Sequence, residues 1–224
     1  MCGIVGGITS KNITPLLMDG LKRLEYRGYD SSGLVILSKD NKLVRERAAG
    51  KVSNLENNLK LKKPSLKGNV GLAHTRWATH GKPSVNNAHP HISKNSISVV
   101  HNGIIENYID LKNLQMKQGY AFTSETDTEV IAHAIESAIK PSDSLLKATQ
   151  KAIKTLNGSY GIGVLSSKYP DQIIAARKGS PLVIGIGDNG NYVASDQMAL
   201  LSVTDKFIFL EEGDIAEIKL DKIT

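Results

Sequence analysis

The chain opens with Met1-Cys2-Gly3-Ile4-Val5-Gly6-Gly7-Ile8, an apolar run that holds the only cysteine of the 224 residues. If Met1 is removed, Cys2 carries both a thiol and a free α-amine, whose pKa of about 7.7–8.0 suits a base at neutral pH. A thiol beside an amine that takes up its proton is an activated nucleophile. The alternative interpretation is a small buried hydrophobe in a first strand.

The composition sets bounds on the class of protein. With 40% hydrophobic residues, the chain can form one large or two small globular domains. No stretch approaches the roughly 18 apolar residues of a membrane span, and the N-terminus lacks the basic-then-apolar layout of a secretory signal. Because one cysteine cannot form an internal disulfide, we expect a cytoplasmic protein in a reducing compartment.

The charge balance shows a mild basic excess. Lys and Arg number 28 against 22 Asp and Glu, which gives a formal net charge of +6. The densest basic cluster, Lys60–Lys67, contains no aromatic residue, although nucleic-acid sites combine basic grooves with aromatic platforms. We therefore interpret this cluster as a solvated loop and expect no nucleic-acid and no membrane partner.

Periodicity predicts an alternation of helices and short strands. Apolar spacing and helix-start signals, among them a capping box over 126–129, predict helices at 13–25, 107–118, 126–138 and 142–156. Apolar runs between turn residues predict strands at 2–8, 31–37, 69–74, 96–101, 159–166, 171–177, 182–186, 191–195, 206–210 and 214–219. Many of these strands lie one turn apart, so antiparallel hairpins should dominate and the helices should cover the outer faces.

The first polar constellation lies in His74–Pro83. Arg76 and Trp77 stand side by side where an apolar strand enters a Gly/Pro loop. The arginine fork matches a carboxylate bidentately, which suits the α-carboxylate of an amino acid. A structural ion pair is the alternative.

Two further constellations have a local explanation as well as a functional one. Asn102 and Gly103 follow another predicted strand, where a side-chain amide and a backbone N–H could stabilise a tetrahedral oxyanion. A simple Asn-Gly turn explains the pair equally well. Asp127 lies at a predicted helix start, where helix capping accounts for a carboxylate without any substrate.

Two patterns resemble binding motifs but lack the required context. Gly185–Gly190 matches the dinucleotide pattern, but a predicted strand follows it in place of the helix that would hold a pyrophosphate. We therefore predict a hairpin turn. His89-Pro90-His91 lacks the spacing of helical metal ligands, and we expect no metal site.

Taken together, these segments resemble the glutaminase domain of the class II glutamine amidotransferases, which belong to the N-terminal-nucleophile hydrolase superfamily. The resemblance covers essentially the whole chain, through the segments Met1–Gly6, Arg23–Gly33, His74–Pro83, His101–Asn107, Ser124–Glu129, Arg177–Leu182 and Ala194–Asp196. The segment Glu25–Asp30 resembles the amino-sugar branch of the family more than its purine, asparagine or glutamate-synthase branches. The resemblance implies an α+β fold, a four-layer αββα sandwich of antiparallel sheets.

The resemblance also implies a role for each matching residue. Cys2 would attack the carboxamide of glutamine, with its own α-amine relaying the proton. Asn102 through its side chain and Gly103 through its N–H would form the oxyanion hole. Arg76 would hold the α-carboxylate of the substrate and Asp127 its α-ammonium.

The remaining implied roles concern the loop and the rest of the enzyme. Trp77, Thr79 and His80 would lie on a loop that closes over bound glutamine, and Arg27 would help to orient the nucleophile. Water would then release glutamate from the thioester, with no metal or organic cofactor. In this family, sugar-isomerase domains follow the glutaminase domain and pass its ammonia to a sugar phosphate. We therefore expect residues 1–224 to form the glutaminase domain alone, from a longer enzyme that is a homo-oligomer.

A competing hypothesis is a binding or regulatory module that kept the fold and lost the chemistry. The absence of Cys2, Asn102 or Asp127 would have supported it, and all three residues are present.

Removal of Met1 is expected to activate the protein. An amide nitrogen is no base near pH 7, so a chain that keeps Met1 should hydrolyse glutamine hardly at all. A chain that begins at Cys2 should be active, and should lose activity as its α-amine is protonated below about pH 7. Intact-mass spectrometry of an active preparation tests this expectation. Full activity in material whose mass includes Met1 rules out the α-amine as the base.

Overall fold

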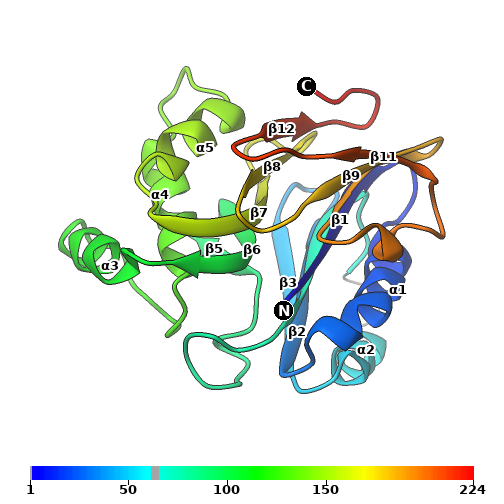
Figure 1. Cartoon of the computed structure of the whole chain (residues 1–224), viewed down its shortest axis with the longest axis horizontal. Coiled ribbons are helices and arrows are strands. Elements are labelled where there is room, and N and C mark those ends of the chain that lie inside the picture. Colours follow the sequence, from blue (N-terminus) through cyan, green and yellow to red (C-terminus); the bar gives the residue numbers. More distant parts are fainter. Residues whose placement is uncertain (1, 62–65) are drawn as a thin grey trace.

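The computed structural model describes residues 2–61 and 66–224 (Figure 1). Its elements, with η for 3₁₀ helices, follow one another as β1 (Gly3–Thr9), α1 (Thr14–Leu24), η1 (Glu25–Arg27), β2 (Ser31–Leu37), β3 (Leu43–Ala49), α2 (Val52–Leu61), β4 (Val70–Arg76), β5 (His91–Ser93), β6 (Ile97–Ile105), α3 (Tyr108–Lys117), α4 (Glu129–Ala138), α5 (Leu145–Ile153), β7 (Gly158–Ser166), β8 (Ile173–Lys178), β9 (Val183–Gly187), β10 (Gly190–Ala194), η2 (Gln197–Ala199), β11 (Lys206–Phe209) and β12 (Ile215–Ile218).

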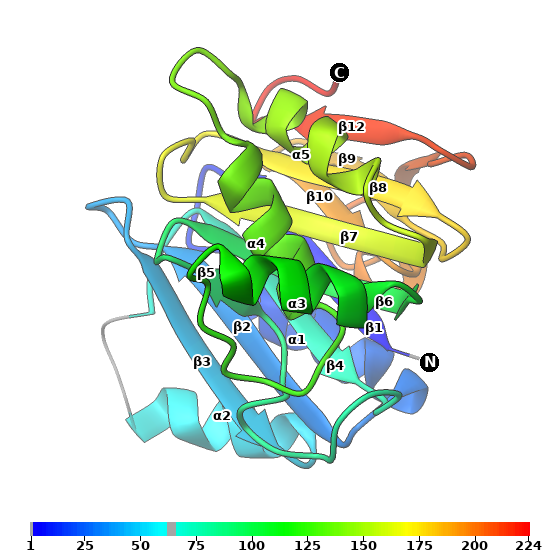
Figure 2. The ribbon, with the colours of Figure 1, turned by 90° about the vertical axis from the view of Figure 1, so that its left-hand side faces the viewer.

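The strands form two antiparallel sheets. The seven-stranded sheet has the order β11-β9-β10-β1-β4-β2-β3, and the five-stranded sheet has the order β12-β8-β7-β6-β5. Figures 1 and 2 show the two sheets face to face, with α1 and α2 outside the first sheet and α3, α4 and α5 outside the second. Strand β1 lies between β10 and β4, well inside the seven-stranded sheet.

Three apolar layers account for this architecture. One layer packs α1 and α2 on the seven-stranded sheet and includes Val5 and Leu21. The second lies between the sheets and includes Ile4 and Leu72, and the third packs α4 and α5 on the five-stranded sheet around Ile162. Ile4 and Val5 enter different layers because successive side chains of a strand point to opposite faces. The predicted four-layer αββα sandwich is confirmed.

The sequence analysis missed the strands β3 and β5, the helix α2 and the 3₁₀ helix η2. Strand β3 lies at a sheet edge and carries three consecutive charged residues, Arg45, Glu46 and Arg47, so it lacks the apolar run of a buried strand. Helix α2 had a readable signal, because Val52, Leu55 and Leu59 recur at helical spacing. The loop predicted over Lys60–Lys67 is wrong at Lys60 and Leu61, which lie in α2. Residues 62–65 of that prediction, like Met1, lie outside the described residues.

The predicted capping box over 126–129 is also wrong. Helix α4 begins at Glu129 with Thr128 as its N-cap, and Thr128 makes no side-chain capping bond. The carboxylate of Glu129 accepts hydrogen bonds from the amides and hydroxyls of Thr123 and Ser124 at 2.6–3.1 Å. These bonds compensate a charge that is 2% exposed, and they tie down the segment that carries Asp127.

The alternative motifs have plain structural explanations. The predicted hairpin at 185–190 is confirmed, since β9 and β10 pair with Gly187 opposite Gly190. Strand β10 therefore occupies the place where a dinucleotide site needs a helix N-terminus. In the part of the chain that is described, none of the helices has both the length and the apolar character needed to cross a membrane.

Leu72 fills space that two glycines leave between the sheets. It is fully buried, and a Cβ on Gly6 or Gly163 would crowd its methyl groups. Leu72→Ala should leave a cavity and lower the free energy of unfolding by about 2–5 kcal/mol, as measured by urea denaturation. The control Leu114→Ala, at a 53% exposed position on α3, should change it by less than about 0.5 kcal/mol. Equal effects of the two substitutions would contradict this packing.

Candidate active site

Cys2 lies directly before β1, so a central strand of the sheet positions its thiol. The amide of Trp77 donates to Sγ at 3.3 Å, and the thiol donates to the carbonyl of Trp77 at 3.4 Å. Burial raises the pKa of the Cys2 thiol above its ordinary value. The thiol is therefore protonated near neutral pH and needs a base before it can attack.

Asn102 and Gly103 reach Cys2 from the other sheet. Asn102, which is buried, donates from Nδ2 to the carbonyl oxygen of Cys2 at 3.1 Å. The two residues lie inside β6, opposite Gly161 and Tyr160 of β7, so the alternative of an Asn-Gly turn is wrong.

Only glycine fits at position 103. Its φ is +131°, a region that L side chains rarely adopt, and a Cβ there would collide with the carbonyl of Ser159. The irregular backbone therefore occurs at the residue whose N–H was predicted to serve the oxyanion hole.

Arg76 ends β4 and holds the loop that follows. Its guanidinium donates to the carbonyls of His80, Gly81 (3.0 Å) and Lys82 (3.5 Å), while the carboxylate of Asp30 lies 3.9 Å away. Arg76 is 3% exposed, so these carbonyls occupy donors that would otherwise be buried without partners. The alternative interpretation was a structural ion pair. The contact of Arg76 with Asp30 is longer than its contacts with the loop carbonyls, so the ion pair is a minor part of its environment.

Asp127 does not cap a helix through its side chain. It lies two residues before α4 and is 4% exposed, and its Oδ2 accepts the amide of Ile105 on β6 at 2.8 Å. This bond places the carboxylate beside the end of β6, next to the Asn102-Gly103 segment. The capping explanation is wrong.

A small pocket brings most of the predicted residues together. Its lining includes the predicted residues Cys2, Arg76, Trp77, Thr79, His80, Gly103 and Asp127. Asn102 joins them through its bond to Cys2. The cavity measures about 10 Å³, which is about the volume that one water-sized sphere occupies and is too small for an amino acid.

Arg27 lies outside this lining. It ends η1, and its side chain, 9% exposed, pairs with Asp196 at 2.9 Å. Asp196 follows Ser195, which exchanges two hydrogen bonds with Ile4 of β1 at 2.9 and 3.0 Å. Arg27 therefore braces the strand end beside the start of β1.

The pocket also contains polar residues that the sequence analysis did not assign, namely His89, His101, Thr126 and Thr128. Burial lowers the pKa of His89 and of His101, and it lowers that of the adjacent His74 to about 3. These imidazoles are therefore neutral near pH 7. The sequence contained one signal for His74: side chains alternate along a strand, so His74 lies on the same face of β4 as Arg76.

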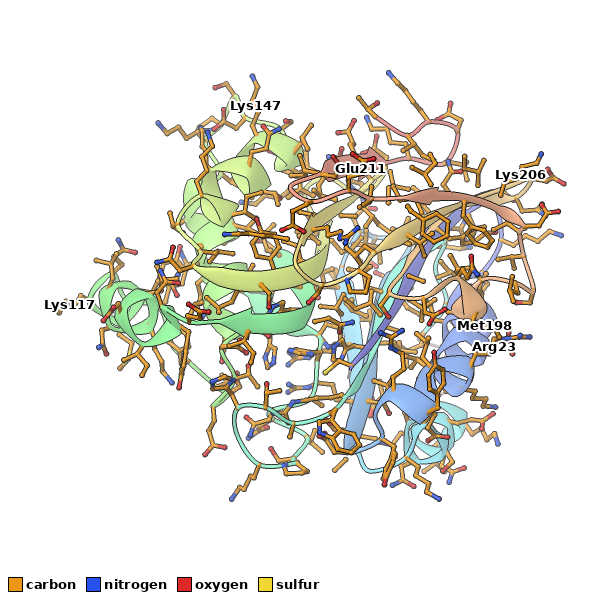
Figure 3. All side chains as sticks on the ribbon, viewed as in Figure 1. Arg23, Lys117, Lys147, Met198, Lys206 and Glu211 are labelled. Atoms are coloured by element: carbon orange, nitrogen blue, oxygen red, sulfur yellow. The ribbon has the colours of Figure 1, made fainter. Side chains whose placement is uncertain are left out.

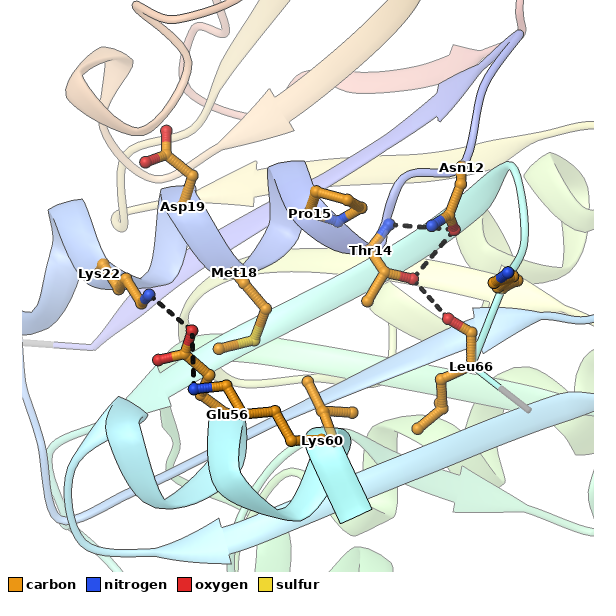
Figure 4. Close-up of a pocket in the computed structure, with 11 residues that line it drawn as sticks. Asn12, Thr14, Pro15, Met18, Asp19, Lys22, Glu56, Lys60 and Leu66 are labelled. Carbon is orange, nitrogen blue, oxygen red and sulfur yellow. Dashed lines mark hydrogen bonds and ion pairs between the residues drawn. The ribbon is translucent and has the colours of Figure 1, made fainter. Parts of the chain in front are cut away.

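A second cavity is much larger than the pocket at Cys2. A cavity of about 470 Å³ lies between α1 and α2, with Met18 and Leu66 among its lining and the Lys22–Glu56 ion pair (3.0 Å) at its edge (Figure 4). Its lining contains no cysteine. The chemistry of the side chains therefore favours the smaller pocket at Cys2.

Within residues 2–61 and 66–224, no three His, Cys, Asp or Glu side chains are arranged to hold a metal ion. Lys117, Lys147 and Lys206 point outward from α3, α5 and β11 at separate parts of the surface (Figure 3).

Comparison with known proteins places this geometry in a family. Residues 74–202 match the family described as glutamine amidotransferase domain. The chain is 54% identical over 224 residues to glutamine–fructose-6-phosphate aminotransferase [isomerizing] of Pseudomonas putida, covering 100% of this chain and 36% of that protein. It is 56% identical over 218 residues to the protein of the same name from Haemophilus influenzae, covering 97% of this chain and 35% of that protein.

A solved structure agrees. Glutamine phosphoribosylpyrophosphate amidotransferase from B. subtilis superposes with a TM-score of 0.83 at 25% identity, over 100% of this chain and 48% of that one. The fold is that of the N-terminal-nucleophile hydrolases. The chain belongs to the glutamine amidotransferase family, and it spans little more than a third of the length of its curated relatives.

The partly buried thiol of Cys2 predicts a shifted pH dependence of alkylation. Because burial raises the pKa of Cys2, the rate of its reaction with iodoacetamide should reach half its maximum at a higher pH in the folded chain than in the same chain unfolded in urea. The chain has one cysteine, so mass spectrometry follows the reaction without ambiguity. An equal or lower midpoint in the folded chain would contradict the assigned environment.

Proposed function

We propose that the chain hydrolyses glutamine to glutamate and ammonia through a thioester on Cys2. The observation that carries the proposal is the convergence, in one pocket, of the chain's single thiol with the backbone of Gly103 and two charged side chains, Arg76 and Asp127. The side-chain amide of Asn102 lies beside them. This set supplies a nucleophile, two oxyanion donors and one charge for each end of an amino acid.

The α-amine of Cys2 is proposed as the base. Among the described residues, the hydrogen-bond partners of Sγ are the two backbone groups of Trp77, and neither can take up a proton. The amine accepts the thiol proton while Sγ bonds to the carboxamide carbon of glutamine. It then returns a proton to the nitrogen as the C–N bond breaks and ammonia leaves. Water next attacks the thioester and releases glutamate.

The oxyanion is proposed to bind between the two sheets. Asn102 gives one N–H of its amide to the carbonyl of Cys2, so its second N–H is available for the negative oxygen. The backbone N–H of Gly103 supplies the other donor. Donors held in place before the reaction stabilise charge that develops only in the transition state.

Arg76 and Asp127 are proposed to bind the α-carboxylate and the α-ammonium. The carbonyls of His80, Gly81 and Lys82 occupy the Arg76 guanidinium, so an incoming carboxylate must displace them. Binding of glutamine is thereby coupled to movement of the loop that carries Trp77, Thr79 and His80. Arg27 is proposed to orient the nucleophile by bracing the start of β1 through Asp196.

The use of the ammonia is a further proposal. Relatives at 54–56% identity over nearly the whole chain are named glutamine–fructose-6-phosphate aminotransferases, whereas the phosphoribosylpyrophosphate enzyme shares 25%. We infer that residues 1–224 form the glutaminase domain of a longer homo-oligomeric enzyme. Its sugar-isomerase domains would convert fructose 6-phosphate into glucosamine 6-phosphate. A cytoplasmic location is consistent with a single thiol that must stay reduced.

Two substitutions test the assigned chemistry. Cys2→Ala should abolish glutamate release and leave the fold intact, because it removes only the nucleophile. Asn102→Ala should lower kcat by about 100- to 1000-fold with little change in KM. The control Asn107→Ala, at the start of α3 and away from the pocket, should leave both constants unchanged. Parental activity of the Cys2 variant would show that the mechanism is wrong.

Substrate analogues test the two charged residues. Glutaramate lacks the α-ammonium and α-N-acetylglutamine masks it, so each should be a poor substrate because the Asp127 carboxylate stays unpaired, at a cost of a few kcal/mol. The α-amide of glutamine masks the carboxylate and should fail at Arg76 in the same way. The ammonia released from each analogue, measured with glutamate dehydrogenase and 2-oxoglutarate, or the acid product, measured by mass spectrometry, gives each kcat/KM. If an ammonium analogue is hydrolysed as efficiently as glutamine, the role assigned to Asp127 is wrong. If the α-amide is, the role assigned to Arg76 is wrong.

A further inference from the structure

We propose that His74 is a positioning residue that fixes the side-chain amide of Asn102 with its NH₂ group toward Cys2. The inference rests on the proposed function, because it explains how one of the proposed oxyanion donors is held. Neither the fold nor the roles given above require a histidine at this place.

The contact crosses between the two sheets. His74 lies on β4 of the seven-stranded sheet and Asn102 on β6 of the five-stranded sheet. Nε2 of His74 lies 3.0 Å from Oδ1 of Asn102 and 3.0 Å from the carbonyl oxygen of His101. Both oxygens are acceptors, so Nε2 carries the proton. The ring is fully buried and neutral at pH 7, since burial lowers its pKa to about 3, and it therefore presents only this one N–H.

This donor selects one of two orientations of the amide. A half-turn about the last side-chain torsion of Asn102 would exchange its oxygen and its nitrogen. The N–H of His74 pairs only with the oxygen, and the carbonyl of Cys2, at 3.1 Å, pairs only with the nitrogen. In the flipped orientation, the amide oxygen would face both the carbonyl of Cys2 and the oxyanion. Without His74, the buried oxygen of Asn102 loses its partner and the flipped state gains population.

His74 is itself held by its neighbours. The ring of His89 meets it edge-on, with centroids 4.0 Å apart and planes at 90°, so Nδ1 of His89 lies over the ring face, 3.0 and 3.1 Å from its two nitrogens. The hydroxyl of Thr128, just before α4, joins Nε2 of His89 at 2.8 Å and Nδ1 of His101 at 2.9 Å. His89 thus covers one face of the His74 ring, and the carbonyl of His101, as a second acceptor, holds the N–H of Nε2 at the Asn102 side.

The first test separates donation from packing. His74→Met fills similar space without a donor, and it should lower kcat by at least about tenfold and by no more than the 100- to 1000-fold expected for Asn102→Ala, with KM within about twofold. His74→Gln, whose terminal amide can place an N–H where Nε2 lies, should recover most of the loss. The matched control His133→Met removes another buried histidine, bonded to Ser93 at 2.8 Å, and should keep the parental kcat. Circular dichroism and Tm verify folding, and His74→Asn, which is too short to reach, replaces the Met variant if that variant does not fold.

The second test is a double-mutant cycle. If His74 acts through Asn102, adding His74→Met to Asn102→Ala should lower kcat by less than about twofold further, because the group it positions is already gone. A full additional loss, or no recovery in His74→Gln, would overturn the inference and leave the oxyanion role of Asn102 intact. Parental kcat in Asn102→Ala would overturn that role in the proposed function, and the inference with it.

Discussion

The proposed nucleophile and the proposed oxyanion donors come from different sheets, so the sandwich must hold its two sheets within hydrogen-bond reach at one end. Apolar side chains such as Ile4 and Leu72 set the separation through the middle of the sandwich. At the end that carries Cys2, polar contacts replace them: Asn102 bonds to Cys2, and His74 bonds to the strand that carries Asn102. Every later step of the proposed chemistry depends on this contact between the sheets. If the thiol of Cys2 moved away from the amide of Asn102, the amide could no longer stabilise the intermediate that the thiol forms.

The loop that follows Arg76 is held against the pocket by two sets of contacts. Arg76 is satisfied by loop carbonyls, and Asp30 accepts the amide of Ala78 at the base of that loop. The loop thus uses as its anchor the cation that the substrate is proposed to need. Glutamine and the closed loop therefore compete for Arg76, and the free energy of carboxylate binding must exceed that of the loop contacts.

The sequence predicted most of the fold because its signals are local. The apolar run at the N-terminus, the helical spacing of α1 and α4 and the glycines of the β9–β10 hairpin each reflect a few neighbouring residues. Strand β3 was missed because it lacks a local apolar run. The capping box was wrongly predicted because a tertiary contact replaced the local one: within the described part of the chain, Glu129 accepts hydrogen bonds from the segment before α4 and does not bond back to the start of its own helix.

The site was harder to predict from local pattern alone. Asp127 suggested a helix cap and Asn102 a turn, because their actual partners lie 22 and 100 residues away along the chain. The resemblance to a known family named these residues, and the structure explains how they meet. It also adds His74, whose partner lies on the facing sheet, so that strand alternation could place it beside Arg76 but could not show its contact with Asn102.

Covalent labelling of the nucleophile tests the central claim most directly. A glutamine analogue with a diazomethyl ketone in place of the carboxamide presents the same α-carboxylate and α-ammonium but alkylates the group that attacks it. After incubation of an active preparation and proteolysis, mass spectrometry should find one adduct, on the sulfur of Cys2, and excess glutamine should prevent it. An adduct on another residue accompanied by loss of activity, with Cys2 unmodified, would contradict the account.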